Sequence, residues 1–133
     1  MTHLLDSNAC IGYLNGRSAN IRSRLAAMTL GDVGVCSVIK AEMFAGAMRS
    51  SDPVRTRTKQ QAFFGQFVSL PFDGTAAEVY AVIRAHLASN GTPIGPYDLQ
   101  IAAIALADGL TLVTHNTREF SRVLGLLLDD WEL

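Results

Sequence analysis

The stretch His3-Leu4-Leu5-Asp6-Ser7-Asn8 places an acid directly after two leucines, and a helical pattern follows it to Leu14. Burial of a carboxylate costs free energy unless the group is paired or coordinates a metal. Asp6 therefore either caps the helix that follows, as Asp often does, or lies against a positive partner. The rest of the sequence has to separate these two alternatives.

The bulk composition fits a small soluble enzyme or binding module. A chain of 133 residues suits one core, so we expect a single domain over residues 1–133. No segment approaches the roughly 20 apolar residues that cross a bilayer, and no signal peptide is visible. Cys10 and Cys36 form neither a CxxC motif nor a disulfide framework. We therefore expect a cytoplasmic protein without a membrane partner.

Apolar runs alternate with helical patterns along the whole chain. The sequence predicts strands at residues 2–5, 33–38, 68–72, 110–114 and 126–128. It predicts helices at residues 7–16, 18–29, 38–51, 53–67, 75–87, 97–107 and 117–122. This alternation is typical of an α/β fold with a parallel sheet of four to five strands and helices on both faces, a three-layer α/β/α arrangement. Ligands of such sheets bind outside the carboxyl ends of the strands, where Asp6 and Asn116 are expected.

Two further acids have helical settings that a solvated surface does not explain well. Asp98 shares a stripe with Ile101, Ala102 and Ala105, so the pattern directs it inward at the start of its helix. The alternative is a first-turn acid that complements the helix dipole. Glu42 shares a face with Ile39, although an isolated helix glutamate is more often exposed.

Asn116 and Glu119 are spaced as in a capping box, which is their structural alternative. Considered together with Asp6, Glu42 and Asp98, however, they place several oxygen-bearing side chains at one end of one sheet. Clustered carboxylates either take up protons or bind a cation. Oxygen ligands suit Mg²⁺ or Mn²⁺ rather than zinc. The residues alone therefore indicate a metal-dependent site that processes phosphoryl groups.

Charge is divided unevenly along the chain. Residues 1–60 contain eight basic and four acidic residues, whereas residues 61–133 contain three basic and eight acidic residues. Such asymmetry either marks a side that faces a polyanion or reflects solvated helix faces. Six arginines are candidates for contacts with such a polyanion: Arg17, Arg22, Arg24, Arg49, Arg55 and Arg57.

Four stretches together resemble the VapC toxins of the PIN-domain ribonuclease family. They are LLDSN at residues 4–8, the helical Glu42, GPYDLQIAAIA at residues 95–105, and LVTHNTREFSRV at residues 112–123 followed by DDW. Each stretch is weakly specific by itself, but their order and spacing cover essentially the whole chain. The resemblance implies a PIN-like sheet and a Mg²⁺- or Mn²⁺-dependent endoribonuclease.

By position, the resemblance assigns Asp6, Asp98 and Glu42 as metal ligands, with Asn116 and Glu119 completing the catalytic set. Asn116 is a departure, because many PIN domains have a further Asp there and an amide carries no charge. The implied reaction is hydrolysis by metal-activated water, which leaves 5′-phosphate and 3′-hydroxyl ends. The motifs GPYD at residues 95–98 and NTREF at residues 116–120 are most similar to the VapC branch that cuts initiator tRNA in the anticodon loop.

The resemblance also implies partners, and one alternative function stays open. Relatives are neutralised by a VapB antitoxin whose C-terminal tail fills the active-site groove, and they form homodimers or larger toxin–antitoxin assemblies. The high apolar content, 49% of the chain, agrees with a covered surface, although a well-filled core is the simpler explanation. The alternative function is a catalytically degenerate PIN fold that binds RNA or protein without cutting.

Overall fold

The computed structural model describes all 133 residues and contains one five-stranded sheet with the strand order β3-β2-β1-β4-β5. Every neighbouring pair of strands is parallel. The strands are β1 (His3–Leu5), β2 (Val33–Cys36), β3 (Val68–Leu70), β4 (Thr111–Val113) and β5 (Leu128–Asp129). Because all strands run the same way, their carboxyl ends share one edge of the sheet.

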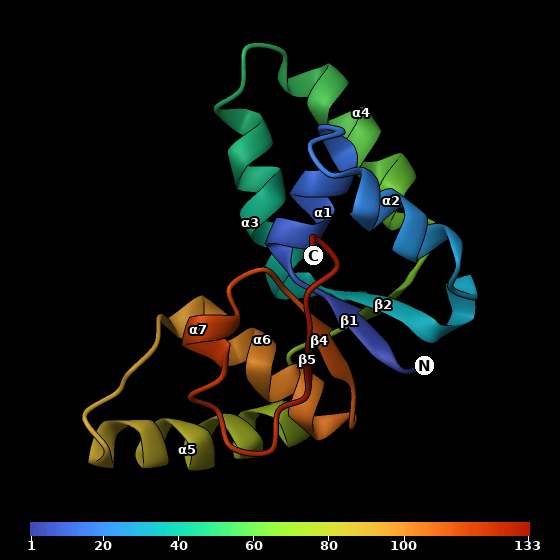
Figure 1. Cartoon of the computed structure of the whole chain (residues 1–133). Coiled ribbons are helices and arrows are strands. Elements are labelled where there is room, and N and C mark those ends of the chain that lie inside the picture. The colour runs from blue at the N-terminus through green and yellow to red at the C-terminus, as the bar shows by residue number, and fades with distance from the viewer.

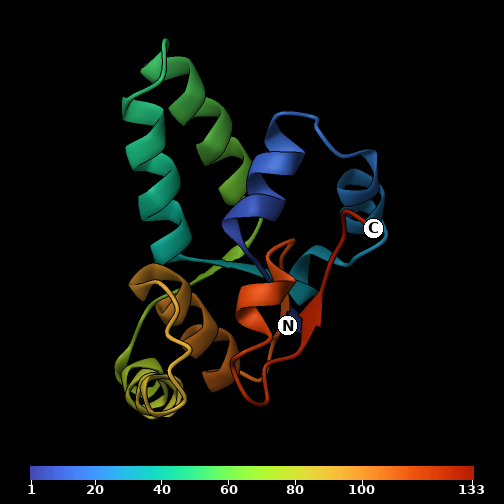
Figure 2. The ribbon, with the colours of Figure 1, turned by 60° about the vertical axis from the view of Figure 1, so that its left-hand side comes forward.

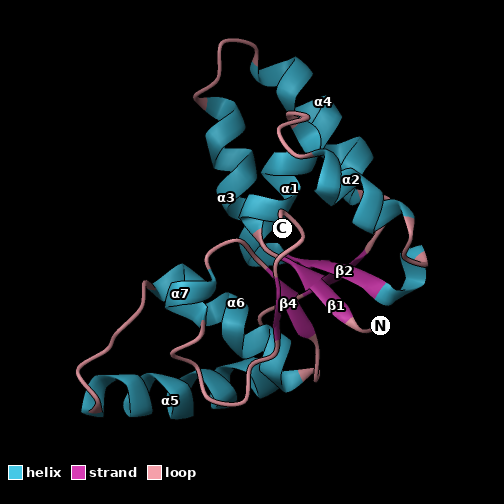
Figure 3. Cartoon of the chain, viewed as in Figure 1, coloured by secondary structure: helices cyan, strands magenta, loops and turns pink.

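Seven α-helices and one short 3-10 helix connect these strands. The helices are α1 (Ser7–Leu14), α2 (Ala19–Ala26), η1 (Leu30–Asp32), α3 (Ser37–Met48), α4 (Pro53–Phe64), α5 (Gly74–Ser89), α6 (Pro96–Ala107) and α7 (Thr117–Phe120). In Figures 1 and 3, α1 to α4 lie above the strands, α6 and α7 lie to their left, and α5 lies at the lower left. The turned view in Figure 2 keeps the two groups apart, which gives the three-layer arrangement that the sequence predicts.

The core forms between the central strands and the helices on either side. Leu4, Val35 and Leu112 are fully buried on the three central strands, as continuous apolar strands of parallel sheets require. Helix α6 is the most buried helix, since every residue from Ile101 to Ala105 is inaccessible. This central helix carries Asp98 in its first turn.

Every predicted strand and helix is present, and the differences concern boundaries. The strand predicted at residues 33–38 ends at Cys36, because Ser37 and Val38 already belong to the first turn of α3. The last strand lies at Leu128–Asp129 rather than at 126–128. The short helix η1 was not predicted. Ser18 caps α2, and its side chain accepts a hydrogen bond from the Ile21 amide.

Candidate active site

Asp6 follows the last residue of β1, in the middle of the sheet and at its carboxyl edge. The Asp6 backbone amide donates to the Val113 carbonyl at 2.9 Å, which continues the β1–β4 ladder. Only 2% of the Asp6 surface is exposed. The Thr114 hydroxyl donates to Asp6 Oδ2 at 2.7 Å, whereas the buried Oδ1 has no hydrogen-bond partner. Asp6 occupies the N-cap position of α1, but its side chain makes no capping hydrogen bond, so capping does not account for its buried carboxylate.

The burial of Asp6 has an electrostatic consequence. Loss of hydration raises the pKa of the Asp6 carboxyl above its ordinary value, and the Thr114 hydrogen bond opposes that rise. The negative charge of Glu119 also raises it. Thr114, itself 1% exposed, is therefore part of the site. Thr114 was not predicted as a site residue, although it is the polar residue that ends the buried run LTLVT.

Glu42 lies on α3 and points toward the same edge of the sheet. It is half-buried, and its Oε1 is inaccessible and has no partner in the chain. Partial burial raises the pKa of the Glu42 carboxyl, and the charge of Asp6 raises it further. Glu42 is therefore not the exposed helix glutamate of the alternative interpretation.

Asp98 enters the site from the first turn of α6. Pro96 occupies the start of this helix, where its fixed φ and missing N–H are well tolerated. Burial raises the pKa of Asp98 to about 6, with further contributions from the charges of Asp6, Glu119 and Glu42. The pKa of Asp98 thus depends on carboxylates from three other segments of the chain, as expected for four acids that share one site.

Asn116 and Glu119 lie together, but they do not form a capping box. The Asn116 side-chain amide donates to Glu119 Oε2 at 2.9 Å, and the Gly95 amide donates to Glu119 Oε1 at 3.4 Å. The Asn116 backbone amide donates instead to the Thr114 hydroxyl at 3.0 Å, so it is not free to bind Glu119. The capping-box alternative is therefore wrong, and Asn116 holds the Glu119 carboxylate in place.

No cation of the protein neutralises this group of acids. The ion pairs of the chain involve Asp32, Asp129, Asp130 and Glu132, and none involves Asp6, Glu42, Asp98 or Glu119. Two buried carboxylate oxygens lack any partner, which is costly in the free protein. A hard divalent ion would offset the mutual repulsion of the acids, and it prefers oxygen ligands of this kind. The donor set therefore fits Mg²⁺ or Mn²⁺.

His115 belongs to a separate group with Asp130 and Glu132, whose possible metal-binding atoms lie within 4.8 Å of one another. Its Nδ1 lies 2.9 Å from Asp130 Oδ2 and 3.4 Å from Glu132 Oε2, and its side chain is exposed. The Arg17 guanidinium donates to the other oxygen of Glu132 at 2.9 Å. This cluster attaches the C-terminal segment to the preceding loops, and it has basic groups of its own.

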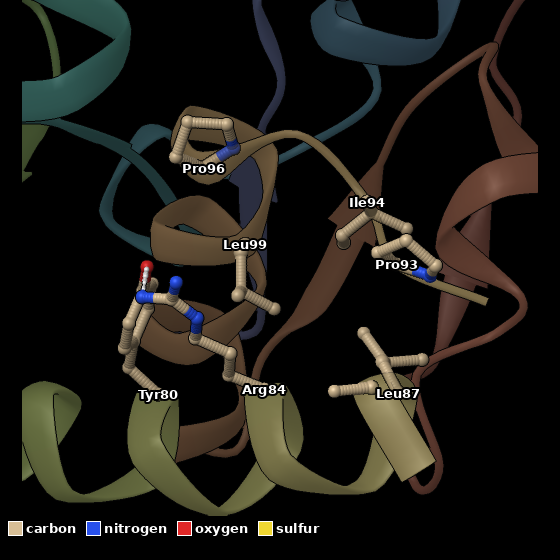
Figure 4. Close-up of a pocket in the computed structure, with 8 residues that line it drawn as sticks. Tyr80, Arg84, Leu87, Pro93, Ile94, Pro96 and Leu99 are labelled. Carbon is tan, nitrogen blue, oxygen red and sulfur yellow. Dashed lines mark hydrogen bonds between the residues drawn. The ribbon is translucent and has the colours of Figure 1, made fainter. Parts of the chain in front are cut away.

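A cavity of about 350 Å³ between α5, α6 and the loop before α6 is not part of the acidic site. Figure 4 shows Leu87, Ile94 and Leu99 on its walls, with the Arg84 guanidinium donating to the Tyr80 hydroxyl. It contains no carboxylate. The chemistry of the molecule is therefore concentrated at the carboxyl edge of the sheet.

The chain matches known proteins over nearly its full length. Residues 3–126 match the family model described as PIN domain. A protein of Shigella flexneri named tRNA(fMet)-specific endonuclease VapC is 39% identical over 128 residues, which is 96% of either chain. The chain belongs to the VapC family of PIN-domain proteins. A VapC-family protein of Haemophilus influenzae, named Ribonuclease VapC2, is 34% identical over 98% of either chain.

A solved structure of a VapC-containing complex has the same fold. The DNA-bound VapBC complex of Salmonella typhimurium contains a chain that is 36% identical and superposes with a TM-score of 0.93 over 98% of both chains. The likeness spans the elements that carry all five predicted site residues. PIN ribonucleases in general depend on divalent metal ions, in agreement with the uncompensated acids of this VapC-family chain.

Proposed function

We propose that this chain is the toxin of a type II toxin–antitoxin pair and a divalent-metal-dependent endoribonuclease. One observation supports this function above all others: Asp6, Glu42, Asp98 and Glu119 influence one another electrostatically, and no cation of the protein pairs with them. The names of the relatives, ribonuclease and endonuclease, agree with it. They favour an active enzyme over a catalytically degenerate PIN fold.

The residues divide into ligands and positioning groups. Asp6, Asp98 and Glu42 would hold the metal ion, Mg²⁺ or Mn²⁺. Thr114 fixes one oxygen of Asp6 and leaves the other free for the ion. Asn116 orients Glu119, whose second oxygen is tied to the backbone of Gly95 just before α6. Glu119 therefore supplies negative charge at the position where Asn116 supplies none.

When bound at this site, a divalent ion stabilises charge on the scissile phosphate and promotes attack by water. The ribose 2′-hydroxyl is not needed as a nucleophile, so the products end in 5′-phosphate and 3′-hydroxyl groups. The protein contributes ionised, immobile oxygen donors at a buried edge. Although burial and the neighbouring charges raise the pKa of Asp98 to about 6, this donor is still mostly ionised at neutral pH.

The substrate that we propose is initiator tRNA, cut in its anticodon loop. The Shigella flexneri relative, 39% identical, is named for its specificity toward tRNA(fMet). A single-stranded loop also suits an edge site, because its unstacked bases and backbone are accessible to side chains.

We further propose a single PIN domain over residues 1–133 that works in the cytoplasm with a VapB-type antitoxin and a second copy of itself. The solved relative is a VapBC complex. Large apolar side chains stay exposed on this chain, including Met48 at 63%, Val54 at 78% and Leu124 at 70%, and such groups often mark interfaces. No helix combines the length and the hydropathy that a bilayer crossing needs.

Cleavage of purified initiator tRNA by the purified protein tests the function. We expect cleavage with Mg²⁺ or Mn²⁺ and none with EDTA, and fragment ends that ligation assays identify as 5′-phosphate and 3′-hydroxyl. Asp6→Asn and Asp98→Asn should lose at least about 100-fold in rate while remaining folded. Asp108→Asn, at the exposed far end of α6, is the matched control and should cleave normally.

Activity that persists in EDTA would contradict the metal mechanism. Equal cleavage of initiator and elongator tRNA would retain the nuclease and remove the proposed substrate preference. Binding of RNA without cleavage under all metal conditions would instead support the degenerate fold.

A further inference from the structure

Tyr97 is unusual among the aromatic residues of this chain. Among the six Phe, three Tyr and one Trp, it is the only exposed side chain, with 59% of its surface accessible. Its ring packs against no other aromatic ring and no cation, whereas Tyr13 and Tyr80 do both. An exposed aromatic ring costs hydration free energy in the free protein, so Tyr97 is available to another molecule.

Tyr97 lines a cavity that also contains a proposed catalytic acid. The cavity has a volume of about 350 Å³ and lies between α3 and α6, at the lower end of the size range of small-molecule sites. Its walls are Ser37, Val38, Ala41, Glu42, Tyr97 and Gln100. Glu42 contributes to both the cavity and the acidic site, and Tyr97 directly precedes Asp98. Whatever fills the cavity is therefore adjacent to the reacting phosphodiester.

The walls of the cavity suit a flat, neutral, polar-edged group. Tyr97 offers a ring face, and Val38 and Ala41 offer apolar surface. The glutamines that make side-chain hydrogen bonds are Gln60 and Gln66, so the amide of Gln100 is free to donate and accept. The carboxylate of Glu42 repels a phosphate but accepts hydrogen bonds from an amino group. These are the contacts that proteins make to an unstacked base.

We propose that the cavity between α3 and α6 binds one unpaired nucleobase of the RNA, next to the scissile phosphate, with Tyr97 stacking on it. This inference rests on the proposed nuclease function and adds a specificity subsite to it. Pro96 fixes the backbone at the start of α6, so the ring is held in place before RNA binds. Gln100, one turn further along the helix, contacts the edge of the base and contributes to base preference.

Cleavage of modified RNA tests the stacking. The substrate is a synthetic stem-loop with the initiator tRNA anticodon arm, and each loop nucleotide is replaced in turn by an abasic one. With the intact RNA, Tyr97→Ala should reduce kcat/KM by about tenfold or more, whereas Tyr97→Phe should retain it. With wild-type protein, one abasic position should cause a similar loss, and Tyr97→Ala should add nothing further at that position.

A binding measurement in EDTA separates stacking from catalysis. We place 2-aminopurine at the sensitive position, and its fluorescence should change on binding to the wild type and to Tyr97→Phe but not to Tyr97→Ala. Val82→Ala, at an exposed position on α5, is the control and should behave as the wild type.

Three results would overturn the inference. The first is normal cleavage of the intact RNA by Tyr97→Ala. The second is that the losses in kcat/KM caused by Tyr97→Ala and by the abasic nucleotide add fully. The third is that Tyr97→Ala changes its oligomeric state but gives the same 2-aminopurine signal as the wild type. The last result would mean that Tyr97 contacts a second copy of the chain. If the wild type itself neither cleaves nor binds the stem-loop, the proposed function fails together with the subsite.

Discussion

Asp98 shows how this site sacrifices stability for function. Its carboxylate lies within the field of Asp6, Glu119 and Glu42, and burial with these charges raises its pKa to about 6. At neutral pH the ionised group therefore destabilises the metal-free fold. The same charge is what a divalent ion needs, so removal of the carboxylate should stabilise the protein and inactivate it together.

We expect Asp98→Asn to stabilise the metal-free protein at pH 7.5. A folded-state pKa of about 6 against 3.8 in the unfolded chain means that the folded state holds the extra proton between these values. The penalty is thus largest above pH 6 and vanishes below about pH 4. Because the half-exposed side chain is screened by water, we expect a gain on the order of 1 kcal/mol. Urea unfolding in EDTA at pH 7.5 and pH 4 measures it.

Asp108→Asn serves as the control, since Asp108 is exposed at the other end of α6. A variant Asp98→Asn that is less stable than the wild type at pH 7.5 would show that the Asp98 charge has a partner within the protein. If Asp98→Asn is the more stable protein in EDTA, as expected, Mg²⁺ should make the wild type the more stable of the two. The reason is that the wild type alone retains all the proposed ligands.

Thr114→Val tests the residue that the sequence analysis did not identify. The substitution removes the donor to Asp6 Oδ2 and the acceptor of the Asn116 backbone amide. We expect a loss of about 1–3 kcal/mol in the free energy of unfolding. The pKa of Asp6 rises further, so Mn²⁺ binding measured by calorimetry should weaken and require higher pH.

Thr111→Val is the matched substitution on the same strand, since Thr111 pairs with His3 at the opposite end of β1. Equal effects of the two substitutions on Mn²⁺ binding would show that the loss is a general property of β4 and not of the contact with Asp6.

The proximity of Asp6, Glu42, Asp98 and Glu119 was predictable because a parallel sheet brings its carboxyl ends together. Asp6 and Asn116 follow predicted strands, which places them at the carboxyl edge of the sheet. Helical spacing places Asp98 and Glu42 on helix faces that also carry buried residues, so these two acids were expected near the same edge. Their partners were not predictable. Whether Asn116 binds a backbone amide or the Glu119 carboxylate depends on the Thr114 hydroxyl, a contact that no local pattern encodes.

At the scale of elements, the errors are confined to places where local propensity and tertiary packing disagree. Val38 is β-branched and extends the apolar run of β2, yet the chain turns into α3 at Ser37. The edge strand β5 is only two residues long and follows Gly125, which has a φ of +81°. Its position is set by pairing of Leu128 and Asp129 with β4, and not by the leucines at residues 126–128 alone.

The segment that follows β5 depends on one aromatic side chain. Trp131 is 2% exposed, donates to Asp129 Oδ2 at 3.0 Å and lies 5.9 Å from the ring of His3. We expect Trp131→Ala to lower the free energy of unfolding by about 3–5 kcal/mol. Circular dichroism should follow the unfolding, because Trp131 is the only tryptophan and the variant has lost that fluorophore.

Leu133→Ala provides the comparison at the same terminus, since Leu133 is 83% exposed and should change stability by less than about 0.5 kcal/mol. If Trp131→Ala unfolds at the same urea concentration as the wild type, the C-terminal segment does not contribute to the cooperative core.

At the scale of the whole molecule, four of the six candidate arginines fall into two groups, paired and unpaired. Arg17 and Arg24 are paired with Glu132 and Asp129 of the acidic C-terminal segment, so much of the charge asymmetry along the sequence is cancelled in space. Arg49 and Arg55 have no carboxylate partner, and they lie where α3 and α4 project from the sheet (Figure 1). The unpaired group is the one available to RNA phosphates.

Salt dependence of RNA binding distinguishes the two groups. In EDTA, which prevents cleavage, the double substitution Arg49→Gln and Arg55→Gln should weaken binding and lower the slope of log K against log salt by about 1.4 to 1.8, since each neutralised phosphate contributes about 0.7 to 0.9. Arg17→Gln with Arg24→Gln should leave the slope unchanged and cost at most about 1 kcal/mol of stability per pair. An equal fall in slope for both double variants would mean that RNA displaces the C-terminal acids from Arg17 and Arg24, and that the paired and unpaired arginines form one binding surface.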